Sequence, residues 1–438
     1  MQHPSYIAFT VKIVYLCILN KYLNRKIMRK ISFLVLFCIA CTSYVWSQST
    51  KPVYPFPQNV IEHGVSSNYI SHKEAFEAYE QWKKNFVRDC NENEARVIKD
   101  DLITVSEGIG YGLAITAYAG DKETFDKFLN YYMARLNERG LMNWIYDACE
   151  SGDNERNGAT DADLDAIIGV IVATKQWPQE TKYVAYAHAL LDSLQKHNFV
   201  MCNNVIVQKP GDAFGGCTCT NPSYYAPGYY RVFAAFKKEH NNAAASEFWT
   251  NAANDSYITL FKNTHPYTGL VYAWTNSEGG DPQNCYYEVS GSGVYNSYQY
   301  DACRTPWRIA KDYIWWGTPE AKTWTQNIVK FVEAPIYAHL EEDGTVWYGA
   351  GGIHNVVDNY WHNGLRRYNP DAPTYGHRHT VPFVGSFALA AMSGTQDRVD
   401  TYMKTFAAVP ANRYYESCLQ VLYMFLASGN FWNPYAMQ

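Results

Sequence analysis

The chain lacks a hydrophobic run long enough to cross a membrane. The mostly apolar stretch near its start, residues 31–41, has eleven residues, whereas a membrane-spanning helix needs roughly 20. The chain also contains no stretch that has the composition of a linker between domains. We therefore expect no permanent membrane insertion, and one folded domain over residues 48–438.

Clusters of Lys and Arg are missing outside the first 47 residues. The chain has 37 basic and 42 acidic residues, and setting aside the six basic residues of this leader leaves 31 against 42. A groove that binds nucleic acid neutralises phosphates with clustered Lys and Arg side chains. The composition therefore argues against nucleic acid as a partner.

Residues 1–47 have the pattern of a leader with a secretory signal peptide. Two basic residues at 29–30 precede the apolar run 31–41, and Val45–Ser47 places compact residues where signal peptidase cuts. We expect a true start at Met28, cleavage after residue 47, and a secreted or periplasmic protein. A lipoprotein motif at residues 38–41 is an alternative, although its first position lacks the usual aliphatic residue.

Eight cysteines follow the leader, an even number in a compartment expected to be oxidising. The sequence predicts disulfides but leaves open which of about 105 full pairings forms. A zinc site would need a paired C-x-x-C or nearby histidines at ligand spacing, which Cys217 and Cys219 do not provide. We expect disulfides or buried thiols, and no metal, at Cys90, Cys149, Cys202, Cys217, Cys219, Cys285, Cys303 and Cys418.

Aromatic residues are abundant: 37 Tyr, 20 Phe and 13 Trp together make up 70 of the 438 residues. This number exceeds what a core alone requires, so many of these rings are expected to face water or a ligand. Tyr and Trp offer an apolar face with a polar handle, which suits sugars, flat ligands and protein partners equally well. The composition therefore predicts a binding cleft without naming its occupant.

About twelve amphipathic helical stretches follow residue 71, separated by loops rich in Gly, Asn, Asp and Tyr. Examples are Tyr111–Tyr118, Leu164–Lys175 and Pro319–His339, whereas strand-like runs such as Val205–Gln208 are few and short. This pattern predicts an all-α domain of six helical hairpins closed into a double ring. In such a ring, polar residues at the starts of the inner helices would share one cleft.

Glu107 lies in a glycine-rich segment, Ser106–Gly112, just before a predicted helix. Glycines at alternate positions let a backbone approach a ligand closely, and the carboxylate could reach a cleft. The alternative is a helix cap, with Ser106 as N-cap and Glu107 interacting with the helix dipole. A dinucleotide-binding motif is excluded because its third glycine would fall at Leu113.

Three aspartates at alternate positions, Asp161, Asp163 and Asp165, open another apolar helix. They resemble half of a calcium loop, but the sixth and twelfth positions of that loop are Ala166 and Val172 instead of Gly and Glu. We therefore expect no calcium. For Asp163 and Asp165 we favour an acidic first turn that satisfies unpaired helix amides.

Two further segments carry polar groups among aromatic ones: Asn221–Arg231, which contains Tyr224, and Tyr300–Arg308. In the second, Asp301 and Arg304 are three residues apart, so one helical turn would place the guanidinium against the carboxylate and keep it ionised. The alternative is a surface ion pair, which the flanking Tyr, Pro and Trp residues argue against.

Five motifs, in this order, resemble those of glycoside hydrolase family 8. The resemblance is strong from about residue 104 to 314 and weaker toward the carboxyl end, and it implies an (α/α)6 barrel with a long sugar-binding groove. The motifs are Ser-Glu-Gly-x-Gly-Tyr-Gly (106–112), Leu-Met-x-Trp (141–144), Ala-Thr-Asp-Ala-Asp (159–163), Pro-Ser-Tyr (222–224) and Tyr-Asp-Ala-x-Arg-x-Pro-Trp-Arg (300–308).

The resemblance implies catalytic roles for three carboxyl groups. Glu107 resembles the general acid that protonates the glycosidic oxygen, and Asp301 resembles the general base that activates water, with Arg304 beside it. Asp161 matches the aspartate that grips the distorted sugar. Inverting hydrolysis of this kind needs the acid and the base roughly 6.5 to 9.5 Å apart, so that a water molecule fits between the base and the sugar.

The resemblance also implies substrate-binding residues. Trp144 would stack on a sugar ring, and Tyr224 would help to position the attacking water. We assign Arg304, Tyr300 and Tyr111 to substrate binding as well, from their places in the motifs. No cofactor is predicted.

The expected partner is a β-1,4-linked polysaccharide or oligosaccharide, cleaved with inversion by a monomer. We favour xylan or xylo-oligosaccharides because segments 221–225 and 304–309 look closest to the xylanase branch. Cleavage within the chain and release from its reducing end both stay open. The alternatives are β-1,4-glucan or chitosan within the same family, and a non-catalytic carbohydrate-binding protein from another class.

Overall fold

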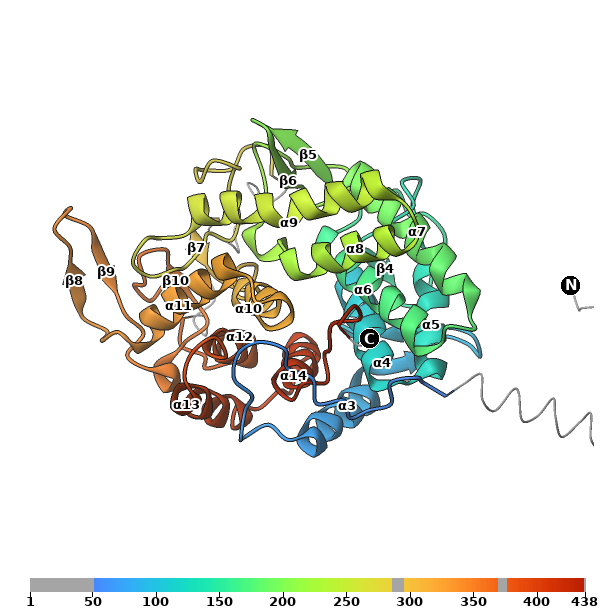
Figure 1. Cartoon of the computed structure of the whole chain (residues 1–438), viewed down its shortest axis with the longest axis horizontal. Helices are drawn as coiled ribbons and strands as arrows, with labels where there is room; N and C mark the ends of the chain where they lie inside the picture. Colours follow the sequence, from blue (N-terminus) through green and yellow to red (C-terminus); the bar gives the residue numbers. More distant parts are fainter. Residues whose placement is uncertain (1–50, 286–294, 369–375, 437–438) are drawn as a thin grey trace, which may run out of the picture. The chain divides into compact units, whose positions relative to one another are not determined.

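Twelve α-helices follow one another in pairs along residues 51–285, 295–368 and 376–436, the part of the chain that the structure, a computed structural model, describes. Six of them form an inner ring: α4 (Ser106–Ala119), α6 (Thr160–Gln176), α8 (Pro227–Glu239), α10 (Thr305–Trp316), α12 (Val381–Ala391) and α14 (Tyr414–Ala427). Each of these packs on the next, and α14 returns to α4 (Figure 1).

The other six helices lie outside this ring, each against one or two inner helices (Figure 1). They are α3 (His72–Phe86), α5 (Lys122–Met133), α7 (Thr181–His197), α9 (Ala243–Asn263), α11 (Pro319–Glu333) and α13 (Gln396–Ala407). The predicted (α/α)6 barrel is therefore confirmed, and residues from Pro52 onward form one compact unit.

The two rings differ in sequence as their burial requires. The inner helix α12, VPFVGSFALAA, is buried at every position from Val381 to Ala391. The outer helix α13 buries only Val399, Tyr402, Met403 and Phe406, which have the spacing of three and four that makes one apolar face. A helix with apolar residues on all sides therefore marks an inner position in this fold.

The alternate glycines of α4 allow close helix packing instead of the close approach to a ligand that we expected. A side chain at Gly110 would collide with the backbone of Ala162 in α6, and one at Gly169 would come within 2.6 Å of the Leu113 backbone. A side chain at Gly108 would come within 2.9 Å of the Tyr414 hydroxyl. These glycines let the starts of α4, α6 and α14 lie side by side.

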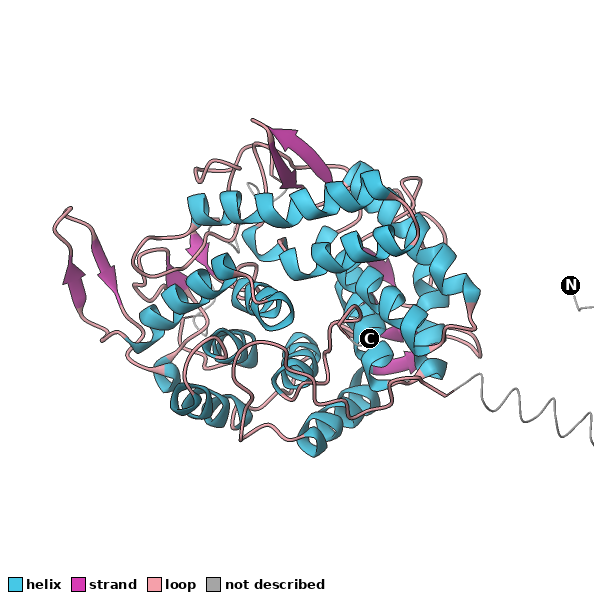
Figure 2. Cartoon of the chain, in the orientation of Figure 1, coloured by secondary structure: helices cyan, strands magenta, loops and turns pink. Residues whose placement is uncertain are grey.

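Within the described residues, ten short strands form five antiparallel pairs in the loops (Figure 2). In one of these pairs Val105 lies opposite Ile145, so the strand that leads into α4 runs next to residue 144. The predicted strand at residues 205–208 is confirmed. The pairs are β1 (Val87–Asp89) with β2 (Ala95–Val97), β3 (Ile103–Val105) with β4 (Ile145–Asp147), β5 (Phe199–Cys202) with β6 (Val205–Gln208), β7 (Ser297–Tyr298) with β10 (Tyr360–Trp361), and β8 (Ala338–Leu340) with β9 (Val346–Tyr348).

Three helix boundaries differ most from those predicted by the apolar periodicity. Helices α4 and α6 begin at Ser106 and Thr160, several residues before the predicted starts, because their first turns carry polar residues that interrupt the apolar pattern. Helix α11 ends at Glu333, and residues 338–340 form β8 instead of continuing the helix. Pro335 explains this end, since proline disfavours helical backbone at the residue before it.

Three disulfides join cysteines of the described residues, and the sequence had left their pairing open. They join Cys90 to Cys149, Cys202 to Cys217 and Cys219 to Cys285, whereas Cys303 and Cys418 are buried free thiols. The predicted leader, residues 1–47, lies outside the described residues. Among the described residues, no helix combines the length and apolar character that a membrane span requires.

Candidate active site

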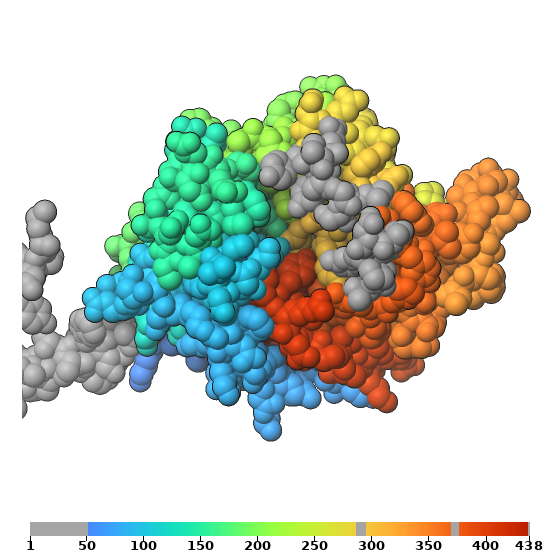
Figure 3. Space-filling view, turned by 180° about the vertical axis from the view of Figure 1, so that it is seen from behind, coloured from blue at the N-terminus to red at the C-terminus, as the bar shows by residue number. Residues whose placement is uncertain are grey.

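The starts of the inner helices converge, as the sequence predicted. Glu107 and Asp161 lie in the first turns of α4 and α6, Arg304 is the N-cap of α10, and Tyr414 begins α14. Tyr224 ends a short 3₁₀-helix, η2 (Pro222–Tyr224), just before α8. Figure 3 shows that the face opposite the viewer of Figure 1 is hollowed between the blue-green and the yellow-to-red parts of the chain.

Arg304 links the carboxylates of two helices. Its Nη1 donates to Glu107 Oε2 at 2.7 Å and to Asp161 Oδ2 at 2.5 Å, and its side chain is only 2% exposed. The expected pair with Asp301 is wrong: among the described residues, the ion-pair partners of Arg304 are Glu107 and Asp161. Two carboxylates at neighbouring helix starts attract the guanidinium more strongly than one half-buried carboxylate does.

Glu107 has the environment of a proton donor. Burial raises the pKa of its carboxyl to about 7; the positive charge of Arg304 lowers the pKa, whereas the negative charges of Asp161 and Asp301 raise it. The Tyr414 hydroxyl donates to Glu107 Oε1 at 3.1 Å. The side chain of Glu107 still keeps 22% of its surface exposed, so a proton on it can reach a bound ligand.

Asp301 lies in the turn before α10 and is held by amide and indole groups. Gln299 Nε2 and Trp274 Nε1 both donate to Asp301 Oδ2, at 3.0 and 3.2 Å. The backbone N–H of Asp301 donates to Gln299 Oε1 at 2.9 Å. These bonds fix the carboxylate, and in the described part of the chain no cation forms an ion pair with it.

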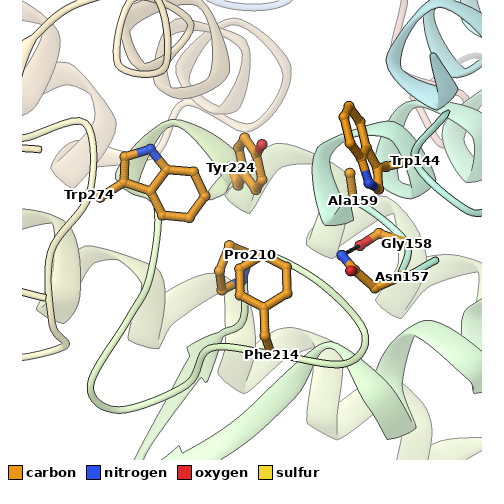
Figure 4. A pocket seen from close by; sticks show the side chains of 8 residues that line it. All are labelled: Trp144, Asn157, Gly158, Ala159, Pro210, Phe214, Tyr224 and Trp274. Atoms are coloured by element: carbon orange, nitrogen blue, oxygen red, sulfur yellow. Dashed lines mark hydrogen bonds between the residues drawn. The ribbon is translucent and has the colours of Figure 1, made fainter. Parts of the chain in front are cut away.

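An aromatic pocket lies along the same face. It is lined by Trp144, Asn157, Gly158, Ala159, Pro210, Phe214, Tyr224 and Trp274. Figure 4 shows Trp144 and Trp274 on opposite sides of this pocket, with Tyr224 between them and Phe214 facing Tyr224. The Arg304 guanidinium lies 5.1 Å from the centre of the Tyr224 ring, so the pocket and the carboxylates belong to one site.

Two predicted substrate-binding residues have other contacts. Tyr111 is 0% exposed and its hydroxyl accepts a hydrogen bond from Arg304 at 3.3 Å, so it lies beneath the carboxylates and not on the groove surface. The Tyr300 hydroxyl donates to Asp358 at 3.0 Å and accepts from Arg378 at 2.7 Å. Tyr111 is therefore fully buried beneath the carboxylates, whereas Tyr300 is partly exposed.

Asp163 does lie in the first turn of α6, but the expected role of Asp163 and Asp165 in satisfying the helix amides is wrong, because both side chains are fully buried and bind side chains of other helices. Asp163 accepts a hydrogen bond from the Tyr132 hydroxyl at 2.6 Å, and burial raises its pKa well above the usual range. Asp165 accepts two hydrogen bonds from Arg308, at 2.6 and 2.5 Å, and both side chains are fully buried. Ala159 is the N-cap of α6 and contributes no side-chain cap.

Sequence reasoning did not find Tyr414, Gln299 or Trp274. Tyr414 has the same signal as Glu107 and Asp161, since it is a polar residue at the start of an inner helix. Gln299 and Trp274 lie in loops without a helical pattern, so no local signal marks them. Within the described ranges, no three metal-ligating side chains cluster.

An (α/α)6 barrel that carries two carboxyl groups beside an aromatic pocket at one end of its inner helices is the architecture of a glycoside hydrolase. Residues 64–429 match the family model described as Glycosyl hydrolases family 8. The chain belongs to this family and is a glycoside hydrolase.

Characterised relatives cover most of the chain. Endoglucanase 2 of Ruminiclostridium josui is 30% identical over 437 residues, which span 93% of this chain and 84% of that protein. The reducing-end xylose-releasing exo-oligoxylanase Rex8A of Paenibacillus barcinonensis is 23% identical over 347 residues, 74% of this chain and 81% of that protein.

Solved structures agree in fold. The beta-1,3-1,4-glucanase from Paenibacillus sp. X4 superposes with a TM-score of 0.72 at 21% identity, covering 87% of this chain and 100% of that chain. Rex8A from Paenibacillus barcinonensis complexed with xylose has a TM-score of 0.66 at 20% identity, covering 84% and 97%.

Proposed function

We propose that this glycoside hydrolase cleaves β-1,4-linked glycans with inversion, with Glu107 as general acid and Asp301 as general base. The observation that carries this proposal is the contrast between the two carboxyl groups. Burial and two neighbouring negative charges raise the pKa of Glu107 to about 7, so it holds a proton in mildly acidic solution. Asp301 instead accepts two N–H donors on one oxygen, as a carboxylate does.

The reaction follows from these assignments. A water molecule gives a proton to Asp301 while its oxygen forms a bond to the anomeric carbon. The bond from that carbon to the glycosidic oxygen breaks, and its electron pair stays on the oxygen, which takes the proton of Glu107. Asp161, held by Arg304, contributes a second negative charge beside Glu107 that favours the protonated acid.

We propose that the enzyme prefers β-1,4-glucan to xylan as its substrate. Three relatives at 30% identity are endoglucanases, whereas the two exo-oligoxylanases are 23% and 24% identical. The segments that favoured xylan in the sequence are largely buried here: Asn221 accepts from Ser223, and Arg308 binds Asp165. Apart from Tyr224, which lines the pocket, these buried residues cannot contact the hydroxymethyl group by which glucose differs from xylose, so they do not decide between the two.

A panel of soluble substrates tests this proposal. Reducing-sugar release is measured from carboxymethyl cellulose, mixed-linkage glucan, xylan and chitosan, with Glu107→Gln as the inactive control. We expect the highest kcat/KM on a glucan. A higher value on xylan would restore the preference from the sequence, and no release above the control from any of the four would contradict the proposal. Product lengths from cellohexaose and xylohexaose then distinguish internal from terminal cleavage.

We also propose that the enzyme is exported and acts as a monomer. Three disulfides support export, since such bonds persist in oxidising compartments. Amino-terminal sequencing of the mature protein should start at Gln48, and a lipid-modified Cys41 would favour the lipoprotein alternative. Size-exclusion chromatography with light scattering should give the mass of one chain.

A further inference from the structure

The two oxygens of the Asp301 carboxylate have different surroundings. Oδ2 accepts from Trp274 Nε1 at 3.2 Å and from Gln299 Nε2 at 3.0 Å. The orientation of the Gln299 amide is determined, because its other end accepts from the Asp301 backbone N–H, which can only donate. Among the described residues, no donor contacts Oδ1 within hydrogen-bond distance.

We propose that Trp274 and Gln299 are positioning residues that engage Oδ2 of Asp301 and thereby reserve Oδ1 for the attacking water. This inference rests on the proposed role of Asp301 as base. A carboxylate on a single-bonded side chain can turn about its last bond, and two donors on one oxygen remove that freedom. The water then meets one oxygen in one orientation, which a near-attack geometry requires.

Trp274 is itself held rigidly. The backbone N–H groups of Thr220 and Thr275 each donate to the carbonyl of the other residue, at 2.7 and 3.0 Å, and Cys219 next to this bridge is joined to Cys285. The backbone N–H of Trp274 also donates to the backbone carbonyl of Tyr295 at 3.1 Å. A side chain on such a support can orient a reacting group within a fraction of an ångström.

The Trp274 side chain also lines the aromatic pocket, edge-on to Tyr224 with ring centres 6.3 Å apart. A sugar that packs on this ring therefore contacts the same side chain that holds the base. Substrate binding and base orientation are coupled through one indole, whose ring contributes to KM and whose N–H contributes to kcat.

Trp274→Phe separates these two contributions, since phenylalanine keeps a ring in the pocket and lacks the N–H donor. Loss of a hydrogen bond to a charged group predicts a fall in kcat of about 10- to 100-fold, with KM changed less than about threefold. Gln299→Met removes the amide clamp at similar volume and should lower kcat by at least as much. Trp144→Phe is the matched control, because it makes the same change on the opposite side of the pocket and should affect KM more than kcat.

A double-mutant cycle tests whether Trp274 acts through Asp301. In the Asp301→Ala background, assayed with an aryl oligosaccharide and azide as external nucleophile, Trp274→Phe should change the rate less than about twofold. An equal fall in both backgrounds, or kcat within about twofold of wild type for Trp274→Phe alone, overturns the positioning role. Wild-type turnover by Asp301→Ala without azide would instead show that the proposed function itself is wrong. Circular dichroism confirms folding of each variant.

Discussion

Replacing Glu107 by glutamine should change how the stability of the protein depends on pH. The pKa of Glu107 is raised from 4.5 to about 7 in the folded chain, chiefly by burial. Below pH 4.5 both the folded and the unfolded chain hold this proton. As pH rises toward 7 the unfolded chain releases it first, so the folded state loses stability over this interval. At about 1.4 kcal/mol for each pH unit, the loss reaches about 3 kcal/mol.

Glutamine has no charge to bury at any pH, so Glu107→Gln should avoid this loss. The difference in unfolding free energy, variant minus wild type, should therefore grow by about 3 kcal/mol between pH 4.5 and pH 7.5. Urea unfolding followed by circular dichroism at several pH values, with the disulfides intact, measures this difference. Turnover of the variant on polysaccharide should fall by a factor of about 10² to 10⁴, because the general acid is lost.

Glu62→Gln is the matched control. Burial also raises the pKa of Glu62 to about 7, and its charge acts on Tyr118, near the end of α4 opposite Glu107. This variant should show the same direction of pH-dependent stabilisation and keep wild-type activity. A difference between Glu107→Gln and wild type that stays constant over the whole pH range would refute the raised pKa of Glu107. Retention of a tenth of wild-type turnover would instead refute its role as general acid.

Three further outcomes are expected. Proton NMR of the earliest products from a β-linked substrate should show the α-anomer first, whereas the β-anomer first would indicate a retaining mechanism. Arg304→Met should raise the pKa of Glu107 and move the basic limb of the pH profile of kcat/KM to higher pH. Asp161→Asn should lower that pKa and move the same limb to lower pH. An unchanged basic limb in both variants would contradict the contacts of Glu107 described above. Asp165→Asn leaves the fully buried Arg308 without a charged partner and should lower the unfolding free energy by about 3 to 5 kcal/mol, a loss that urea unfolding at pH 7 would detect.

Local patterns predicted those parts of the fold that depend on neighbours in the chain. The apolar repeat located the twelve helices of the described residues and the strand at 205–208, because the outer helices bury a face that recurs every three to four residues and inner helices such as α12 are apolar on all sides. It failed at the starts of α4 and α6, where Glu107 and Asp161 break the apolar pattern. Helix starts that carry site residues are therefore the places where periodicity alone is least informative.

The partners of the charged groups could not be predicted from spacing. Arg304 and Asp301 are three residues apart, yet Arg304 binds Glu107 and Asp161, which lie 197 and 143 residues away. The partner of Asp165 could not be predicted either. In an exposed helix turn this side chain would face water, whereas in the barrel it is buried and forms an ion pair with Arg308.

The sequence by itself determined the order of the helices, the apolar surfaces that drive them into a double ring, and the residue types at the inner-helix starts. Only the tertiary structure decided which carboxyl is buried beside a second negative charge, which cysteines meet, and which indole reaches Asp301. The physical reason is distance along the chain. Folding brings together groups that lie from 15 to 197 residues apart, and the free energy of each such contact depends on burial and geometry that no local segment contains.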